Sequence, residues 1–216
     1  MFINIHTHNP RHAGEWSIRN IYRNFDHAAT GSPLSMGLHP WNIDPGTWKA
    51  GLDQLKKYST APNVLAIGEA GLDKLCKTDW ALQVDAFAAQ LSWVHETRKP
   101  LIIHCVRAYD DILKMLKAYN IKTACIFHGF NRNVSIAKQI IGHGHYLSFG
   151  SALQLNHVRE SLRAVPLNRI FLETDDAETP IAVVYQLAAE TLGMSVDDVI
   201  SQIRQNTTSV FGINIA

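Results

Sequence analysis

The chain has 216 residues, of which 46% are hydrophobic, and it carries 20 basic against 19 acidic side chains for a net charge of +1. This length and composition favour one globular domain spanning residues 1–216. The balanced charge and the lack of a basic block exclude a basic tail, so affinity for nucleic acid would have to come from a local patch.

The cysteines and the N-terminus indicate the compartment. Cys76, Cys105 and Cys125 are odd in number and form no CxxC pattern, which is typical of reduced thiols rather than of a disulfide framework. His6 and His8 lie where the apolar core of a signal peptide would be, and no apolar run approaches the roughly 20 residues that span a bilayer. We therefore expect a soluble, cytoplasmic protein without a membrane partner.

Short apolar runs alternate along the chain with longer amphipathic ones. The runs predicted as strands cover residues 2–8, 16–25, 34–38, 64–69, 101–105, 124–128, 146–149 and 169–174, of which 16–25 and 34–38 are the weaker two. Most of them are continuously apolar, as expected of parallel strands that are covered on both faces.

Apolar residues at helical spacing predict helices between several of these runs. The clearest is 80–94, where Trp80, Val84, Phe87, Leu91 and Val94 fall on one face. Similar patterns cover 52–58, 112–119 and 197–203, and the last of these has Ser195 in front of it as a candidate N-cap.

This alternation predicts a parallel sheet wrapped by helices. With about eight strands and no glycine-rich GxGxxG or GxxxxGK[ST] turn, we expect a closed (β/α)8 TIM-like barrel. Only about 25 residues separate His8 from Leu34, too few for a complete strand–helix–strand unit with its loops. The predicted barrel is therefore shortened, and its first outer helix is missing.

Residues that can bind a metal recur at the C-terminal ends of the apolar runs: they are His6, His8, His39, Glu69, His104, His128 and Asp175. His6 and His8 are two residues apart, so on a strand both point to the same face. In a barrel the carboxyl ends of all strands converge on one mouth. A buried charge without a partner is costly, so one shared cation explains the recurrence better than independent core histidines.

Six motifs occur in the order seen in the TatD family, which the chain resembles from residue 3 to about 176. They are IHTH at 5–8, GLHP at 37–40, IGEAGLD at 67–73, PLIIH at 100–104, HGF at 128–130 and LETD at 172–175. That family consists of metal-dependent hydrolases with an amidohydrolase-like barrel, and many members are described as deoxyribonucleases.

The resemblance implies two divalent metal ions, with His6, His8 and Asp175 binding one, His104 and His128 the other, and Glu69 bridging both. Imidazoles and carboxylates without a thiolate favour zinc or manganese, and magnesium stays open. Such a pair lowers the pKa of a bound water and clamps the leaving group. Asp175 is then the candidate to orient or deprotonate the nucleophile, so Asp175 and Glu69 are the predicted catalytic residues.

His39, Arg107 and Arg132 are the predicted substrate-binding residues. His39 could donate to a phosphate or to a metal-bound water, or it could be a turn residue fixed by Pro40. The two arginines could pair with phosphate oxygens, or they could be solvated loop residues.

Two further carboxylates are assigned supporting roles. Glu173 is predicted to point to the same side of its strand as Asp175 and to support the site. Asp73 is predicted to cap the turn or helix after Glu69.

The leading functional hypothesis is a two-metal deoxyribonuclease that cleaves phosphodiester bonds, with DNA as its partner. The alternative is a hydrolase of a small lactone, amide or phosphoester with the same metal centre. The third is an inactive barrel that serves as a binding protein. The sequence shows no obligate protein partner, and it leaves the oligomeric state open.

Overall fold

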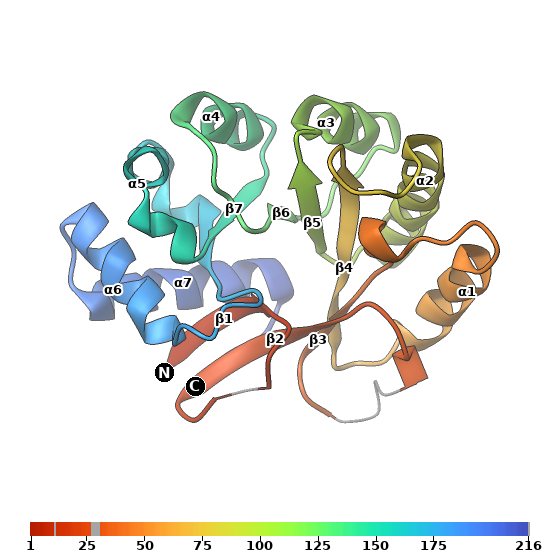
Figure 1. Cartoon of the computed structure of the whole chain (residues 1–216). Helices are drawn as coiled ribbons and strands as arrows, with labels where there is room; N and C mark the ends of the chain where they lie inside the picture. Colours follow the sequence, from red (N-terminus) through yellow and green to blue (C-terminus); the bar gives the residue numbers. More distant parts are fainter. Residues whose placement is uncertain (11, 27–30, 216) are drawn as a thin grey trace. The chain divides into compact units, whose positions relative to one another are not determined.

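The computed structural model describes residues 1–10, 12–26 and 31–215. These residues form two compact units, one of Met1–Arg19 with Ile126–Ala216 and one of Asn20–Cys125. In both units parallel strands alternate with helices (Figure 1). Among the described residues, no helix combines the length and the apolarity needed to cross a bilayer.

The first unit contains the strands at both ends of the chain. β1 (Phe2–Thr7) pairs with β2 (Glu15–Ile21), and β6 (Cys125–Phe127), β7 (Tyr146–Phe149) and β8 (Ile170–Leu172) pair in series, all in parallel. A parallel bridge between Thr7 and Asp175 joins β1 to the segment after β8. The helices of this unit are α4 (Val134–Gly142), α5 (Asn156–Arg163), α6 (Ile181–Leu192) and α7 (Val196–Phe211).

The core of the first unit is mainly aromatic and aliphatic. Phe130 and Phe149 pack edge to face, with ring centroids 5.5 Å apart. Tyr185 of α6 is fully buried, and its hydroxyl both donates to the carbonyl of Ile3 and accepts from the Ile3 amide, at 2.9 and 3.1 Å. This hydroxyl satisfies two backbone groups of β1 and so ties α6 to the strand that carries His6.

The second unit has three parallel strands, β3 (Leu34–Met36), β4 (Val64–Asp73) and β5 (Leu101–Val106). Its helices are α1 (Trp48–Tyr58), α2 (Trp80–Thr97) and α3 (Tyr109–Ala118), with a 3₁₀ turn, η2, at Pro40–Asn42. Its core includes a cluster of Phe25, Leu34, Met36, Leu38, Ile43, Leu52, Leu55, Val64 and Ala86.

All eight predicted strands are present, and their bounds differ most at β2, which ends at Ile21 rather than at residue 25, and at β4. The sequence predicts the end of β4 at Glu69, whereas the strand continues to Asp73. Gly71 pairs with His104 so closely that a Cβ at Gly71 would lie 1.9 Å from the carbonyl oxygen of His104. Glycine at this position lets β4 and β5 approach each other closely, and it does not interrupt β4.

The predicted helices are present, and Ser195 caps α7, because its hydroxyl accepts from the amide of Asp198 at 3.1 Å. Residues 8–14 form no helix in the part that the structure describes, which agrees with the predicted loss of the first outer helix. α4, α5 and α6 are not among the predicted helices. α5 has a buried face of Val158, Ser161 and Leu162, but its eight residues are too few for a repeated apolar pattern to stand out. α6 is apolar around most of its circumference, so it shows no one-sided pattern.

His145 makes the first unit sensitive to acid. Burial, together with the charges of His143 and Arg169, lowers the pKa of His145 to about 4. At a pH below its ordinary pKa of about 6.5, His145 is protonated in the unfolded chain but stays neutral in the folded chain. The free energy of unfolding therefore decreases as the pH falls from 6.5 toward 4. The free energy of unfolding, measured by urea unfolding, should decrease between pH 7 and pH 4.5 by about 2 kcal/mol less in His145→Gln than in the wild type. An identical pH dependence in the two proteins would contradict this assignment.

Candidate metal centre

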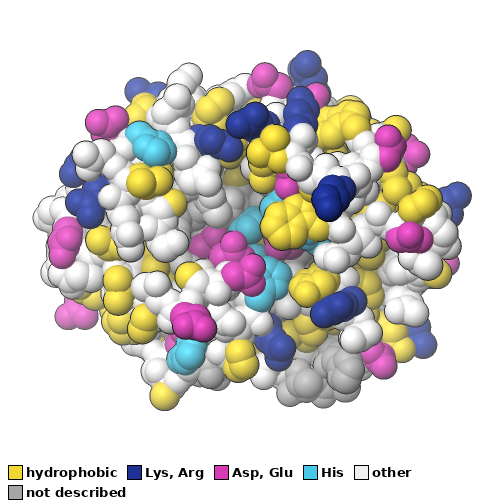
Figure 2. Space-filling model, in the orientation of Figure 1, with side chains coloured by type: hydrophobic (Ala, Val, Ile, Leu, Met, Phe, Trp, Pro, Cys, Tyr) yellow, Lys and Arg dark blue, Asp and Glu magenta, His cyan; other side chains and the backbone are white. Residues whose placement is uncertain are grey.

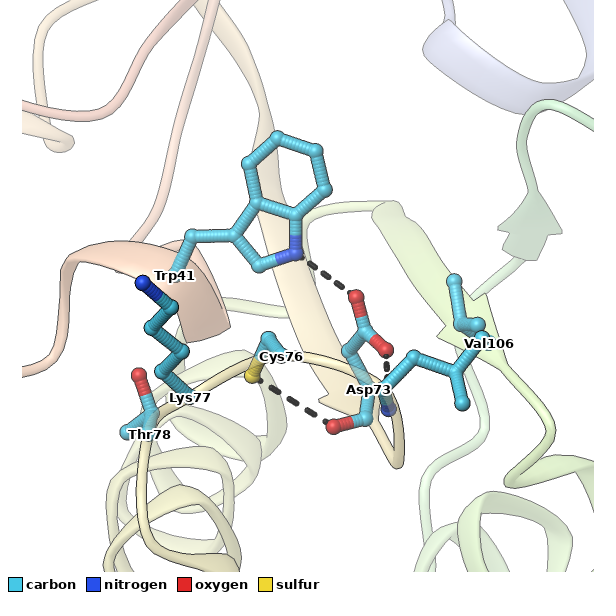
Figure 3. Close-up of a pocket in the computed structure, with 7 residues that line it drawn as sticks. Trp41, Asp73, Cys76, Lys77, Thr78 and Val106 are labelled. Atoms are coloured by element: carbon cyan, nitrogen blue, oxygen red, sulfur yellow. Dashed lines mark hydrogen bonds between the residues drawn. The ribbon is translucent and has the colours of Figure 1, made fainter.

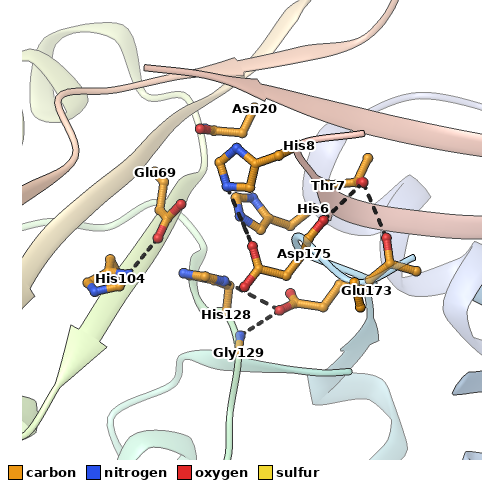
Figure 4. Close-up of polar contacts among 12 residues, drawn as sticks. His6, Thr7, His8, Asn20, Glu69, His104, His128, Gly129, Glu173 and Asp175 are labelled. Carbon is orange, nitrogen blue, oxygen red and sulfur yellow. Dashed lines mark hydrogen bonds and ion pairs between the residues drawn. The ribbon is translucent and has the colours of Figure 1, made fainter. Parts of the chain in front are cut away.

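His6, His8 and Asp175 form a first ligand group at the end of β1. The carboxylate Oδ1 of Asp175 lies 3.5 Å from Nε2 of each histidine (Figure 4). His6 is completely buried, whereas the Asp175 side chain is 41% exposed. His6 is therefore enclosed by the protein, whereas the carboxylate of Asp175 faces solvent. A metal site that admits a substrate needs such an exposed side.

The backbone positions Asp175 against the histidines. Its amide donates to the carbonyl of His6, and its own carbonyl accepts from the amide of His8, at 3.1 and 3.2 Å. Asp175 has a left-handed φ of 54°, which turns the chain out of the β8 direction. Aspartate tolerates this conformation better than most residues, so the ligand also ends the strand.

A buried polar network supports the same strand ends. The side-chain amide of Asn4 donates to the Glu15 carboxylate at 3.1 Å and to the Thr174 hydroxyl at 2.8 Å. The backbone amide of Thr174 donates to the side-chain oxygen of Asn4 at 3.1 Å. The Thr174 hydroxyl also contacts that of Thr7 at 3.2 Å. These bonds fix the residues on either side of the ligands, and no sequence motif pointed to Asn4.

His128 lies in the first unit, beside His6. Their ring centroids are 4.3 Å apart. Oε1 of Glu173 accepts from the amide of Gly129 at 2.6 Å and lies 3.4 Å from Nδ1 of His128 (Figure 4). Glu173 is buried, and its Oε2 has no hydrogen-bond partner among the described residues. The carboxylate therefore orients the imidazole of His128.

Replacing Glu173 tests this orienting role. We expect Glu173→Gln to weaken zinc affinity by about 10- to 100-fold, because the imidazole loses its anionic partner while the chain keeps its shape. Competition with a fluorescent chelator measures the affinity. Glu178→Gln, at an exposed position five residues later, is the matched control. Equal affinities in the two variants would show that Glu173 has only a structural role.

His39, Glu69 and His104 form a second ligand group, in the second unit. Oε1 of Glu69 lies 2.5 Å from Nδ1 of His104 and 3.0 Å from Nε2 of His39, and these two nitrogens are 3.2 Å apart. All three side chains are buried. The sequence predicts His39 as a substrate contact; the structure places it with two of the predicted ligands.

The backbone around Glu69 is irregular in a way that presents its side chain. The pairing of β4 with β5 shifts register between Ile67 and Ala70, and such irregularities redirect a side chain. A Cβ at Gly37 would lie 2.5 Å from the carbonyl oxygen of Glu69, so only glycine lets the end of β3 come this close. The glycine of the GLHP motif therefore brings His39 near Glu69.

Asp73 extends the second group on the side of His104. Its Oδ2 accepts from Nε1 of Trp41 at 2.6 Å and lies 3.4 Å from Nε2 of His104, and its Oδ1 accepts from the Leu75 amide at 2.7 Å. Burial raises the pKa of Asp73, but the hydrogen bonds from Trp41, Leu75 and His104 outweigh it and hold the pKa below its ordinary value. Asp73 thus bonds the turn after β4, as predicted, and also contacts a predicted ligand.

Two buried glutamines of α2 hold the loops of this group. Gln90 accepts from the Leu38 amide at 2.7 Å and donates to the Leu38 carbonyl at 3.2 Å. Gln83 makes the same pair of bonds with Asp73, at 2.8 and 3.1 Å. The two residues are seven apart and so share a helix face. Their polarity and burial together mark them as loop supports, a role that the sequence did not reveal.

The predicted arginines lie further out. Arg107 follows β5 directly, is exposed, and has a left-handed φ of 55°. Arg132 is half-buried, and its carbonyl accepts from the Ser161 hydroxyl at 2.8 Å. His143 and His145 precede β7, at the N-terminal end of that strand.

Each ligand group fits a divalent cation. The donor atoms of His6, His8 and Asp175 lie within 4.8 Å of one another, and so do those of His39, Glu69 and His104. Mixed imidazole and carboxylate donors suit zinc or manganese. Figure 4 shows the contacts of Asp175 with the histidines of the first group and the contact of Glu69 with His104 in the second.

The sequence and the fold both match known proteins. The family model described as TatD related DNase matches residues 17–212. An uncharacterized metal-dependent hydrolase of Buchnera aphidicola is 34% identical over 66% of this chain and 55% of its own length. The uncharacterized metal-dependent hydrolase TatD of Mycobacterium tuberculosis is 30% identical over 76% of this chain and 60% of its own length. The chain thus spans little more than half of these curated relatives.

A solved structure shows the same fold. The crystal structure of YjjV, a TatD homologue from Escherichia coli, superposes with a TM-score of 0.84 over 98% of both chains at 22% identity. This similarity confirms the predicted (β/α)8 barrel class.

Proposed function

Since the chain belongs to the TatD related DNase family, we propose that it is a metal-dependent hydrolase whose two histidine–carboxylate groups bind the metal ions of a deoxyribonuclease. The observation that carries the proposal is the pair of compact ligand groups, whose residues lie in strands or in the segments that follow them. Zinc, manganese or magnesium would activate water and stabilise the leaving oxygen. Glu69 as the bridge between two ions is part of this proposal.

The protein residues have separate tasks. Asp175 is fixed through its backbone while its carboxylate is partly exposed, so it can orient the attacking water and take its proton. Glu173 keeps the His128 ring in one orientation. Arg107 and Arg132 would pair with phosphate oxygens of the substrate. These tasks are those of ester hydrolysis.

The charge distribution favours a short segment of single-stranded DNA as the substrate. Basic side chains are interspersed with acidic ones on the face drawn in Figure 2, and the net charge is +1. Extended contact with duplex phosphates would need a basic surface. Recognition of a strand end needs only a few local contacts. The thiols of Cys76, Cys105 and Cys125 suit a reducing cytoplasm, which we propose as the location.

A substrate panel tests the proposal. The protein is treated with a chelator, reloaded with zinc, manganese or magnesium, and assayed on a single-stranded oligonucleotide, a p-nitrophenyl phosphodiester and a lactone. We expect metal-dependent cleavage of the oligonucleotide and of the diester. Cleavage of the lactone alone would favour the small-substrate hydrolase. No cleavage of any substrate with any metal would favour the binding protein.

A further inference from the structure

Two exposed apolar side chains lie together beside the second ligand group. Trp41 and Leu75 are 62% and 61% exposed, more than any other large hydrophobic side chain that the structure describes. Both line a cavity of about 500 Å³, whose other lining residues are Asp73, Cys76, Lys77, Thr78 and Val106 (Figure 3). A concave, largely apolar surface with a few polar groups is typical of a ligand site.

Trp41 is exposed and yet held in place. Its indole Nε1 donates to Asp73 at 2.6 Å (Figure 3). Its backbone amide donates to Nδ1 of His39 at 3.1 Å. The indole packs edge-on against the His39 ring, with centroids 5.0 Å apart at 86°. An indole that merely covered Asp73 would be buried. Here the indole is 62% exposed and is held by these contacts, so a ring that stacks on it costs little conformational entropy.

The cavity adjoins the second ligand group through Asp73. Asp73 lines the cavity and also contacts Nε2 of His104 at 3.4 Å, and His104 contacts Glu69. A substrate with its reacting ester at the Glu69 group can therefore extend a neighbouring substituent into the cavity. Lys77 is the only cationic residue among those that line it. The cavity thus offers a flat apolar surface with one positive charge, which matches a nucleobase beside its phosphate.

We propose that this cavity is a nucleobase subsite, in which the base next to the scissile phosphodiester stacks on Trp41, with Leu75 and Val106 beside it. The inference rests on the proposed function, because the ester position is defined by the Glu69 group. It goes beyond that function by assigning the contact that recognises a nucleotide rather than another ester. Stacking tolerates every base, so the subsite selects nucleotides without selecting a sequence.

Binding tests the subsite without catalysis. Calorimetry compares thymidine 5′-monophosphate with 2-deoxyribose 5-phosphate, which lacks the base, on the protein as purified and after zinc loading. We expect the wild type to bind the nucleotide about 10-fold more tightly. Trp41→Leu should abolish this preference, and Trp41→Phe, which keeps a flat ring, should keep most of it. Leu75→Ser, which leaves the bond to Asp73 intact, should reduce it about threefold.

Tyr119→Leu is the control, because it removes an exposed aromatic ring of the same unit outside the cavity, and it should keep the full preference. Equal binding of the two ligands by the wild type would overturn the inference, as would an undiminished preference in both Trp41→Leu and Leu75→Ser.

A kinetic comparison separates this inference from the proposed function. The p-nitrophenyl ester of thymidine 5′-monophosphate is compared with methyl p-nitrophenyl phosphate, which has no base. Trp41→Leu should lower kcat/KM at least fivefold more for the first ester than for the second. No hydrolysis by the wild type would refute the proposed function, and the binding preference would still decide the inference. Equal losses on both esters would show that Trp41 acts only by holding Asp73 and His39.

Discussion

Replacing Glu69 by alanine is expected to lower kcat/KM on the order of 10³-fold. The Glu69 carboxylate is buried between the imidazoles of His104 and His39, at 2.5 and 3.0 Å. Its removal leaves two imidazoles with nitrogens 3.2 Å apart and no anion to hold a cation between them. Steady-state hydrolysis of the p-nitrophenyl phosphodiester measures the loss.

Metal content tests whether Glu69 is the bridge. If Glu69 bridges two ions, Glu69→Ala should lose metal from both ligand groups, and elemental analysis should find close to none. If it serves only the second group, the ion at His6, His8 and Asp175 should remain. Glu96→Gln, an exposed carboxylate on α2, is the control and should keep the wild-type content. Unchanged metal content in Glu69→Ala would sink the assignment altogether.

Asp175→Asn is expected to lower kcat by about 10²- to 10⁴-fold, the range of general-base loss. The amide cannot take up a proton, but asparagine tolerates the left-handed φ of 54° at this position. The backbone bonds to His6 and His8 do not involve the side chain, so the fold should be kept. The circular dichroism spectrum and the thermal midpoint check this, and stopped assays over a range of pH measure kcat.

The neighbouring Asp176 provides the matched control. It is exposed and follows Asp175 directly, so Asp176→Asn makes the same chemical change one residue away. It should change kcat less than twofold. If both variants lose activity equally, the loss reflects the charge of the loop rather than a proton transfer at Asp175. An acidic limb in the pH profile that persists in Asp175→Asn would likewise place the base elsewhere.

Much of the site could be predicted because its residues follow apolar runs. His6, His8, His104, His128 and Asp175 lie at or near strand ends, where an apolar run meets a polar residue, whereas Glu69 follows its apolar run but lies inside β4. The loss of the first outer helix could be predicted from the short interval between His8 and Leu34. These properties depend on local sequence alone.

The grouping of those residues could not be predicted, because it depends on approach between strands. His39 joins Glu69 and His104 because Gly37 lets β3 come close to β4, a contact that no local pattern encodes. Gln83 and Gln90 lie on a helix face that is otherwise apolar, and their role depends on two distant loops. Trp41 resembles a core residue in the sequence, and only its 62% exposure singles it out.

The most direct test of the metal centre is the number of zinc ions that the chelator-treated protein takes up at equilibrium, measured together with the recovery of phosphodiesterase activity. The two ligand groups predict that uptake approaches two ions per chain, with activity recovering as they bind. Full activity in the chelator-treated protein, or no uptake of zinc, would contradict the metal-dependent mechanism.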